Sequence, residues 1–157
     1  MAADLSFTPD AADLALLRAL LADGSLSAKE AGARAGLSQP AAWRRIRRLE
    51  EAGVIRRRRV ALNRAKLGYG VTVFMGVKLA AKGRSRVEEF ERAVIAIPEV
   101  QLVQHVLGVY DYRLRVVARD LADFERILRR RIMTLPGIGE VESNVLLSEE
   151  KSGAVQL

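Results

Sequence analysis

The spacing of apolar residues changes near residue 70, from a purely helical period to a mixture of strand and helix periods. Thr8-Pro9-Asp10 predicts a helix start, with Thr8 as cap and Pro9 in the first turn, and Gly24 predicts its end. Ser27 predicts the cap of a short second helix that runs to Ala35. Gly36-Leu37-Ser38 then predicts a tight turn into a third helix, so this part has the spacing of a helix-turn-helix unit.

The third helix is strongly amphipathic. Ser38 is its expected cap, Pro40 falls in the first turn, and Gly53 is expected to end it in the left-handed conformation. One narrow apolar stripe is predicted at Ala42, Ile46, Leu49 and Gly53, and the arginines at 44, 45, 47 and 48 are predicted to cover the rest of the surface. We expect Gly32 to mark the point where the second helix approaches the third closely. The alternative is that a weak helix simply tolerates a glycine there.

Residues after the third helix complete a first domain. An apolar, β-branched start predicts a wing strand over residues 54–62, and two glycines close a linker over residues 63–70. We therefore expect a winged helix-turn-helix DNA-binding domain at residues 1–62, a linker at 63–70 and a second domain at 71–157.

The second domain follows the order strand, helix, strand, strand, helix, strand. Strands are predicted at 71–79, 100–107, 112–118 and 141–147, a helix before Pro98, and another capped by Asp120 that carries Leu121, Phe124, Leu128 and Ile132. This order indicates a ferredoxin-like βαββαβ domain and an α+β chain overall. Helices are expected to cover one sheet face only, yet the strands of the hairpin are apolar on both sides. One side carries Val100, Leu102 and Val106, and the opposite side carries Val103 and Leu107. A second copy is the simplest cover, so we expect a homodimer through this domain.

Charge is concentrated in the first half. The 157 residues carry a net charge of +7, and residues 1–70 hold 13 basic and 7 acidic side chains against 13 and 12 in the rest. Ten basic residues lie between Ser38 and Lys66, opposed only by Glu50 and Glu51. The alternative is an ordinary surface helix whose charges are solvated. This density of positive charge, however, favours binding to a polyanion, and double-stranded DNA is the expected partner.

Composition argues against several other classes of protein. There is no cysteine and a single histidine, His105, so no thiol catalysis, metal site or cofactor is expected. His105 on an alternating strand is read as a packed residue rather than a ligand. The N-terminus lacks an export signal and the longest apolar stretch is too short to cross a membrane, so a cytoplasmic location is expected.

The DNA-reading residues are expected on the N-terminal part of the third helix, which enters the major groove in helix-turn-helix proteins. These candidates are Ser38, Gln39, Pro40, Trp43 and Arg44. Arg44 is the candidate for a guanine and Gln39 for an adenine. Phosphate contacts are expected from Arg45, Arg47, Arg48, Arg56, Arg57, Arg58 and Arg59. For Trp43, packing between helices stays an open alternative.

At this level of detail the chain resembles the Lrp/AsnC (feast/famine) family of transcription regulators. The matching phrases run in order along almost the whole chain: Asp13-x-x-Leu16-Leu17-x-x-Leu20, Asp23-Gly24-x-Leu26-Ser27, Gly36-Leu37-Ser38, Arg44-Arg45-Ile46-x-x-Leu49-Glu50, Gly53-Val54-Ile55, Leu67-Gly68, Phe90 with Pro98-Glu99-Val100, His105-Val106-x-Gly108-x-Tyr110-Asp111-Tyr112 and Leu135-Pro136-Gly137-Ile138. The resemblance implies a regulator whose second domain dimerises, often assembles into octamers, and binds an amino-acid effector between subunits.

The resemblance also implies where the effector binds. Gly108, Tyr110 and Asp111 match the family's hairpin motif and become the effector candidates, with a simple turn as the alternative reading. The chain also departs from the pattern: the family often has an aromatic residue at Arg58 and an acidic one at Val109, and it usually has leucine and alanine where this chain has Ala31 and Gly32. The departure at Val109 leaves the ligand class open.

Two other functions fit the same organisation. Siroheme decarboxylases share the two-domain plan, and the stretch from Ile55 to Tyr69 resembles them, but they use histidine in that neighbourhood, whereas here Arg64 follows Asn63. Without a second histidine the general acid and base are missing, so no enzyme activity and no catalytic residues are expected. The other alternative is a nucleoid-type architectural protein with little sequence preference.

Overall fold

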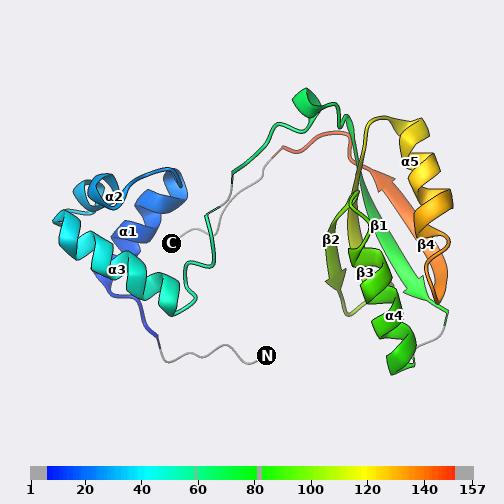
Figure 1. Ribbon diagram of the computed structural model, residues 1–157, viewed down its shortest axis with the longest axis horizontal. Coiled ribbons are helices and arrows are strands. Elements are labelled where there is room, and N and C mark those ends of the chain that lie inside the picture. Colours follow the sequence, from blue (N-terminus) through cyan, green and yellow to red (C-terminus); the bar gives the residue numbers. More distant parts are fainter. Residues whose placement is uncertain (1–6, 59, 81–82, 151–157) are drawn as a thin grey trace. The chain divides into compact units, whose positions relative to one another are not determined.

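The computed structural model describes residues 7–58, 60–80 and 83–150. These residues form two compact units, and the boundary between the units along the chain lies between Ala61 and Leu62. The first unit contains α1 (Ala11–Ala22), α2 (Ala28–Arg34) and α3 (Gln39–Glu51). The second contains a four-stranded sheet with α4 and α5 (Figure 1). Each unit encloses its own cluster of buried apolar side chains.

The helix starts of the first unit depend on side-chain caps. The cap of α1 is Asp10, whose carboxylate accepts from the Asp13 amide at 2.8 Å, while the Asp13 carboxylate accepts from the Asp10 amide at 3.1 Å. The predicted start at Thr8 is therefore wrong, because this reciprocal pair satisfies the free amides two residues later. Ser27 caps α2 as predicted, together with Glu30. Ser38 occupies the cap position of α3, although its hydroxyl makes no capping hydrogen bond.

The core of the first unit confirms the predicted apolar stripe. Ala42, Ile46 and Leu49 of α3 are buried against α1 and α2, and Gly53 has φ +70° where the helix ends. A Cβ built on Gly32 would lie 2.8 Å from the Ala42 Cβ. This confirms that Gly32 is the contact point at which α2 approaches α3, rather than a tolerated weakness of α2.

The predicted wing strand does not form in the described part of residues 54–62, which carries no strand. The Ile55 amide donates to the Leu49 carbonyl at 3.0 Å, and the chain then continues without regular structure. No strand is described elsewhere in this unit, so the extended segment lacks the partner that a β-ladder requires. The strand prediction was wrong because β-branched residues specify an extended backbone but not its partner.

The second unit confirms the predicted ferredoxin-like order. Its antiparallel sheet has the order β2-β3-β1-β4, built from β1 (Val71–Leu79), β2 (Val100–His105), β3 (Tyr112–Ala118) and β4 (Ile138–Val145). One sheet face packs against α4 (Arg84–Ile95) and α5 (Leu121–Ile127). A short 3-10 helix, Ala65–Leu67, lies before β1 in the segment predicted as a linker.

The helix after Asp120 differs from its prediction. Asp120 does cap α5, accepting from the Asp123 amide at 2.7 Å, but the helix changes to a π-helical turn over Leu128–Ile132. Ile132 at the end of this turn is buried, whereas Leu121, the first residue of α5, is 60% exposed. The buried residues of α5 are Phe124 and Ile127, so Leu121 does not belong to the face that packs on the core.

A bulge in β2 changes which side chains face the helices. Val100 lies opposite Val116 and Val103 opposite Leu114, but Leu102 lies opposite Arg115. Val100 and Val103 therefore pack on the core, while Leu102 points to the open face. The predicted grouping of Val100 with Leu102 was wrong, since an extra residue reverses the alternation.

Candidate nucleic-acid interface

The exposed face of α3 begins at the first turn of the helix. Gln39, Pro40, Trp43, Arg44 and Arg47 are all exposed, opposite the buried stripe. The Trp43 side chain is 54% exposed, and the Arg47 guanidinium lies 5.4 Å from the centre of its ring. The alternative that Trp43 packs between helices is therefore wrong. The two side chains form a stacked pair that presents a ring and a cation on the surface.

Arg44 belongs to a concave part of the same surface. A hollow of about 360 Å³ is lined by Leu37, Ala41, Arg44, Arg45 and Arg48. Within the described residues the Arg44 guanidinium has no ion pair or hydrogen bond. A cation with five N–H groups and no internal acceptor is suited to bind an anion or a base edge from outside the chain.

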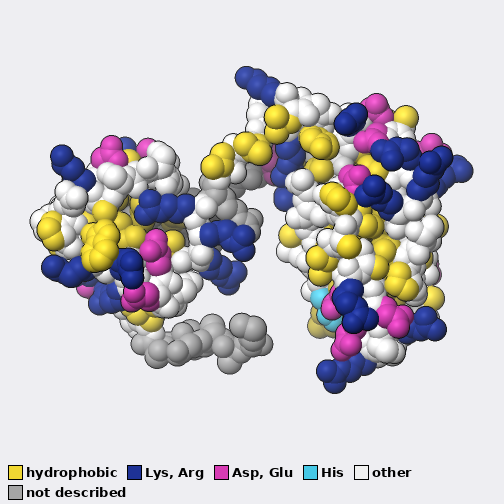
Figure 2. All heavy atoms as spheres, viewed as in Figure 1, with side chains coloured by type: hydrophobic (Ala, Val, Ile, Leu, Met, Phe, Trp, Pro, Cys, Tyr) yellow, Lys and Arg dark blue, Asp and Glu magenta, His cyan; other side chains and the backbone are white. Residues whose placement is uncertain are grey.

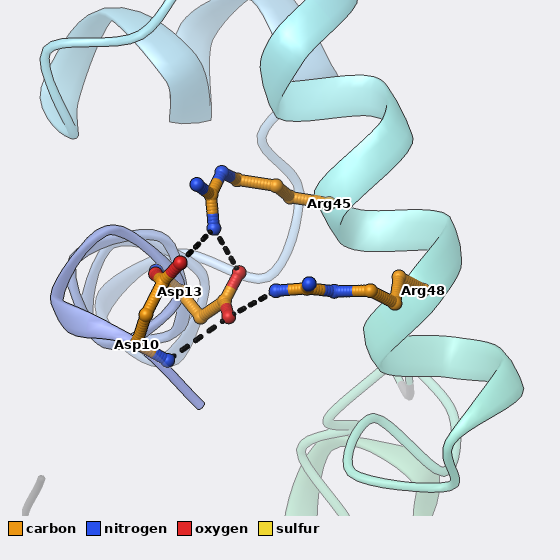
Figure 3. Close-up of polar contacts among 4 residues, drawn as sticks. All are labelled: Asp10, Asp13, Arg45 and Arg48. Atoms are coloured by element: carbon orange, nitrogen blue, oxygen red, sulfur yellow. Dashed lines mark hydrogen bonds and ion pairs between the residues drawn. The ribbon is translucent and has the colours of Figure 1, made fainter. Parts of the chain in front are cut away.

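Arg45 and Arg48 are placed differently, because both guanidinium groups point toward α1 (Figure 3). Arg45 Nη1 donates to Asp10 Oδ2 at 2.6 Å and to Asp13 Oδ1 at 2.8 Å. Arg48 Nη2 donates to Asp13 Oδ2 at 2.5 Å. The hydrogen bond from Arg45 lowers the pKa of Asp10, and Asp10, followed by Asp13, raises the pKa of Arg45. Two of the predicted phosphate-binding arginines are thus already neutralised within the domain.

The role of the two aspartates was not visible in the sequence reasoning. In the sequence, Asp13 is part of a phrase that resembles the Lrp/AsnC family, and Asp10 is part of a predicted helix start; neither position points to a partner on α3. The sole available signal was their three-residue spacing, which suits a reciprocal cap. Their partners lie 32 to 35 residues further along the chain, and no local pattern connects them.

The arginines that follow α3 also divide into two groups. Arg56 and Arg57 are exposed, whereas Arg58 Nη1 donates to the Leu26 carbonyl at 3.0 Å and ties this segment to the turn between α1 and α2. Arg59 lies outside the described residues. On the visible face of the second unit, basic and acidic side chains are interspersed (Figure 2), in keeping with its near-neutral charge.

The predicted effector residues lie around the loop between β2 and β3. Gly108 is exposed, and nothing lies within 4 Å of a Cβ built there. The Asp111 carboxylate accepts from the Leu79 amide at 2.9 Å, which ties this loop to the end of β1. The Tyr110 ring covers Gly76, and its hydroxyl donates to Glu142. The structure therefore separates the three candidates, since Asp111 and Tyr110 bind the sheet and only Gly108 is unconstrained.

The face of the sheet that no helix covers carries a second hollow. Its volume is about 380 Å³, and Phe74, Leu102, Gln104, Tyr110, Arg113, Glu142 and Asn144 are among its lining residues. Phe74 is 40% exposed there. Arg115 on the same face has a buried Nε without a hydrogen-bond partner among the described residues. His105 is exposed, although its ring stacks on the core residue Tyr112 with ring centroids 4.9 Å apart, so this chain by itself does not bury the histidine that the sequence predicts to be packed.

A helix-turn-helix unit with an exposed cationic recognition helix, joined to a ferredoxin-like domain, defines a class of two-domain DNA-binding regulators. A profile described as winged helix-turn-helix DNA-binding matches residues 9–56, and one described as Lrp/AsnC ligand binding domain matches residues 72–155. The chain belongs to the Lrp/AsnC family of transcriptional regulators.

Similar proteins cover almost the whole chain. The proline dehydrogenase transcriptional activator of Rhizobium radiobacter is 34% identical over 91% of this chain and 92% of its own length. The leucine-responsive regulatory protein of Rhizobium meliloti is 33% identical over 90% and 91%. A crystal structure of an AsnC family transcriptional regulator from Agrobacterium tumefaciens covers 95% of this chain and 97% of that one, with 33% identity and a TM-score of 0.86.

A further solved structure contains a ligand. It is a transcriptional regulator from Neisseria meningitidis in complex with L-methionine, 27% identical, with a TM-score of 0.88 over 93% of this chain and 94% of that one. The similarity therefore extends through both domains, including the one that carries the predicted effector residues.

Proposed function

We propose that this protein regulates transcription by binding a specific DNA sequence through the N-terminal part of α3. The observation that carries this proposal is the arrangement of α3, whose apolar stripe is buried while Gln39, Trp43, Arg44 and Arg47 face outward. In this proposal Arg44 and Gln39 contact base edges, and Ser38 and Pro40 lie beside the backbone at the helix start.

Phosphate contacts are proposed for the remaining exposed cations. Arg47, Arg56 and Arg57 are exposed, and Arg59 retains the role predicted for it. Arg58 donates one hydrogen bond to the Leu26 carbonyl, and its other N–H groups can still bind a phosphate. Arg45 and Arg48 are weaker candidates, because carboxylates already occupy part of each guanidinium.

The experiment is a binding comparison between a cognate duplex, selected from a random library with the wild-type protein, and a scrambled duplex. Arg44→Ala should lose about 1 to 3 kcal/mol on the cognate duplex and relax selection at one base position. Arg84→Ala is the matched control, because it removes the same charge from an exposed site of the second unit. Equal losses on both duplexes would assign Arg44 to a phosphate, and a wild-type preference near one would favour an architectural protein instead.

We further propose that a small effector, of the amino-acid class, binds the second domain and alters DNA binding or assembly. The support is the similarity to the L-methionine complex and the exposed loop that carries Gly108, Tyr110 and Asp111. A thermal-shift screen of the twenty amino acids tests it. Gly108→Leu is the most informative variant, because no atom of the protein lies within 4 Å of a Cβ built at this position, so the new side chain should obstruct a ligand without disturbing the fold. It should abolish the ligand-induced shift without lowering the basal Tm, and an undiminished shift would remove Gly108 from the site.

We also propose a homodimer through the uncovered sheet face, with the octamer that the family resemblance implies as its further assembly. Phe74 and the unpartnered Arg115 Nε are the features of this face that a second copy would cover. Light scattering after size-exclusion chromatography should give at least a dimer mass, and Phe74→Glu should shift it toward the monomer. A monomeric wild-type protein at all concentrations would refute this part.

The proposal is for a regulator rather than an enzyme, since the similar proteins are named as regulators. A siroheme decarboxylase-like activity remains testable by absorbance after incubation with tetrapyrrole, where a bound-pigment spectrum and loss of carboxylate would contradict the proposal. A cytoplasmic location is part of the proposal. In the described ranges no helix has the length and apolar character needed to span a membrane.

A further inference from the structure

Asp13 is the one charged residue among the described ones that is completely buried, with a side-chain exposure of 0%. Its two carboxylate oxygens are used separately: Oδ1 accepts from Arg45, and Oδ2 accepts from Arg48 and from the Asp10 amide. A buried carboxylate without cationic partners is strongly unfavourable, so Asp13 requires these arginines to remain where they are.

The cluster formed by Asp10, Asp13, Arg45 and Arg48 contains two carboxylates and two guanidinium groups. Its formal charge is therefore zero, and as a unit it attracts phosphate only weakly. The remaining pair on α3 has no partner on α1: Arg44 has no ion pair among the described residues, and Arg47 pairs only with the exposed Glu51 of its own helix, at 3.5 Å. The four arginines of the recognition helix thus divide into a pair that holds the helix and a pair that faces outward.

The geometry also restrains the rotation of α3 about its own axis. Arg45 and Arg48 lie three residues apart on one side of the helix, about 4.5 Å along its axis, and both end on the same carboxylate (Figure 3). Two attachments on one side fix which residues point in the opposite direction. Each residue subtends about 100° of the helix, so a small rotation would redirect Arg44 and Gln39 away from a base edge.

We propose that Asp13 is a positioning residue for sequence reading: it keeps Arg45 and Arg48 from the DNA backbone and fixes the orientation of α3, so that base discrimination depends on it more than overall affinity does. This inference rests on the proposed function, because it assumes that α3 reads bases. It assigns Arg45 and Arg48 to the positioning of α3 and not to phosphate binding.

The first test compares two substitutions that change net charge equally. Asp13→Asn releases Arg48 and leaves Arg45 paired with Asp10 alone. Asp23→Asn removes a carboxylate that binds Ser25 and pairs with Arg34 of α2 at 3.9 Å, and that has no contact with α3 among the described residues. Affinities are measured by fluorescence anisotropy on the selected and the scrambled duplex over a salt series. Asp13→Asn should lower the preference for the selected duplex at least about tenfold and steepen the salt slope by about 0.9 for each arginine released. Asp23→Asn should match the wild-type protein in both quantities.

A graded variant extends this comparison. Of the two arginines, Asp10 contacts only Arg45, and asparagine can still accept from the Asp13 amide as a helix cap, so Asp10→Asn should give a change between those of the other two variants. A preference and slope for Asp13→Asn that equal those of Asp23→Asn would overturn the proposal. Circular dichroism confirms that each variant is folded at the assay temperature.

The second test approaches the cluster from the arginine side and does not require Asp13→Asn to fold. Arg48→Gln should lower the preference while leaving affinity for scrambled DNA and the salt slope unchanged. If Arg48 grips a phosphate instead, both duplexes lose affinity equally and the slope becomes shallower by about 0.9, which overturns the proposal. The wild-type preference is measured first: a value near one refutes the proposed function itself, whereas a large value with unaffected variants refutes only the role of Asp13.

Discussion

Gly32 allows a prediction in which two effects of opposite sign compete. Replacing it with alanine favours α2 locally by about 1 kcal/mol, because glycine is a poor helix former. The new Cβ, however, would lie 2.8 Å from the Ala42 Cβ and 3.1 Å from the Leu37 carbonyl oxygen. The first distance is about 0.7 Å shorter than ordinary carbon contact. Neither atom is at the end of a flexible side chain, so α2 and α3 must separate.

Overpacking of this kind costs about 1 to 3 kcal/mol, and the rigid neighbours place Gly32→Ala in the upper part of that range. After the helix-propensity gain, we expect a net loss of about 1 to 2 kcal/mol. Guanidinium unfolding of the full chain followed by tryptophan fluorescence measures it, because the single tryptophan, Trp43, lies on α3 and reports the first domain. Loss of DNA preference should accompany the loss of stability, since the contact sets how closely α2 and α3 pack.

Two further variants make the reasoning refutable. Ala33→Gly, at an exposed position of the same helix, measures the propensity effect without the contact and should cost about 1 kcal/mol. In the double variant Gly32→Ala with Ala42→Gly, the clashing methyl is removed, so the two substitutions should be less harmful together than their sum. A Gly32→Ala protein that is about 1 kcal/mol more stable than the wild type would show that the contact is not limiting.

Three other predictions concern individual contacts. Because Arg45 lowers the pKa of Asp10 below its ordinary 3.8, the stability that this carboxylate contributes is present above that pH and lost as the pH falls through the lowered value. Acid unfolding followed by tryptophan fluorescence should be less steep in Asp10→Asn, and parallel curves would contradict this. Gly76→Ala should displace the Tyr110 ring, which a Cβ would approach to 2.5 Å, and cost about 1 to 3 kcal/mol in thermal unfolding, whereas Gly108→Ala, with nothing within 4 Å, should cost far less. Asp111→Ala should lose about 1 kcal/mol with the hydrogen bond to the β1 amide, and Asp111→Asn, which keeps an acceptor, should recover most of it; equal losses would show that the bond is unimportant.

The sequence by itself determined the features that depend on neighbours within one or two turns. Ser27 and Asp120 cap their helices, the apolar stripe of α3 is buried, and the strand and helix order of the second unit is the predicted one. These features follow from side-chain spacing and backbone preference, which are local properties. The phrases that resemble the Lrp/AsnC family extended this to the class of protein, and the comparisons confirmed it.

Local shifts in register could not be predicted from side-chain spacing. The bulge in β2 moves one position out of step, so Leu102 faces away from the core although simple alternation groups it with Val100. The helix after Asp120 likewise changes to a π-helical turn at Leu128, which no single helical period describes. The described part of residues 54–62 lacks the predicted wing strand for a related reason, because an extended segment becomes a strand only where another strand supplies hydrogen bonds. Such features depend on what the rest of the fold places alongside.

Only the tertiary structure decided the roles of the charged residues on α3. In the sequence, Arg44, Arg45, Arg47 and Arg48 are four equivalent cations on one helix. In the fold, Asp10 and Asp13 lie against two of them from 32 to 35 residues away, balance their charge together and leave the other two outward. The physical reason is that helical spacing sets the direction of each side chain relative to its own axis, whereas the charge that it meets depends on which helix packs beside it.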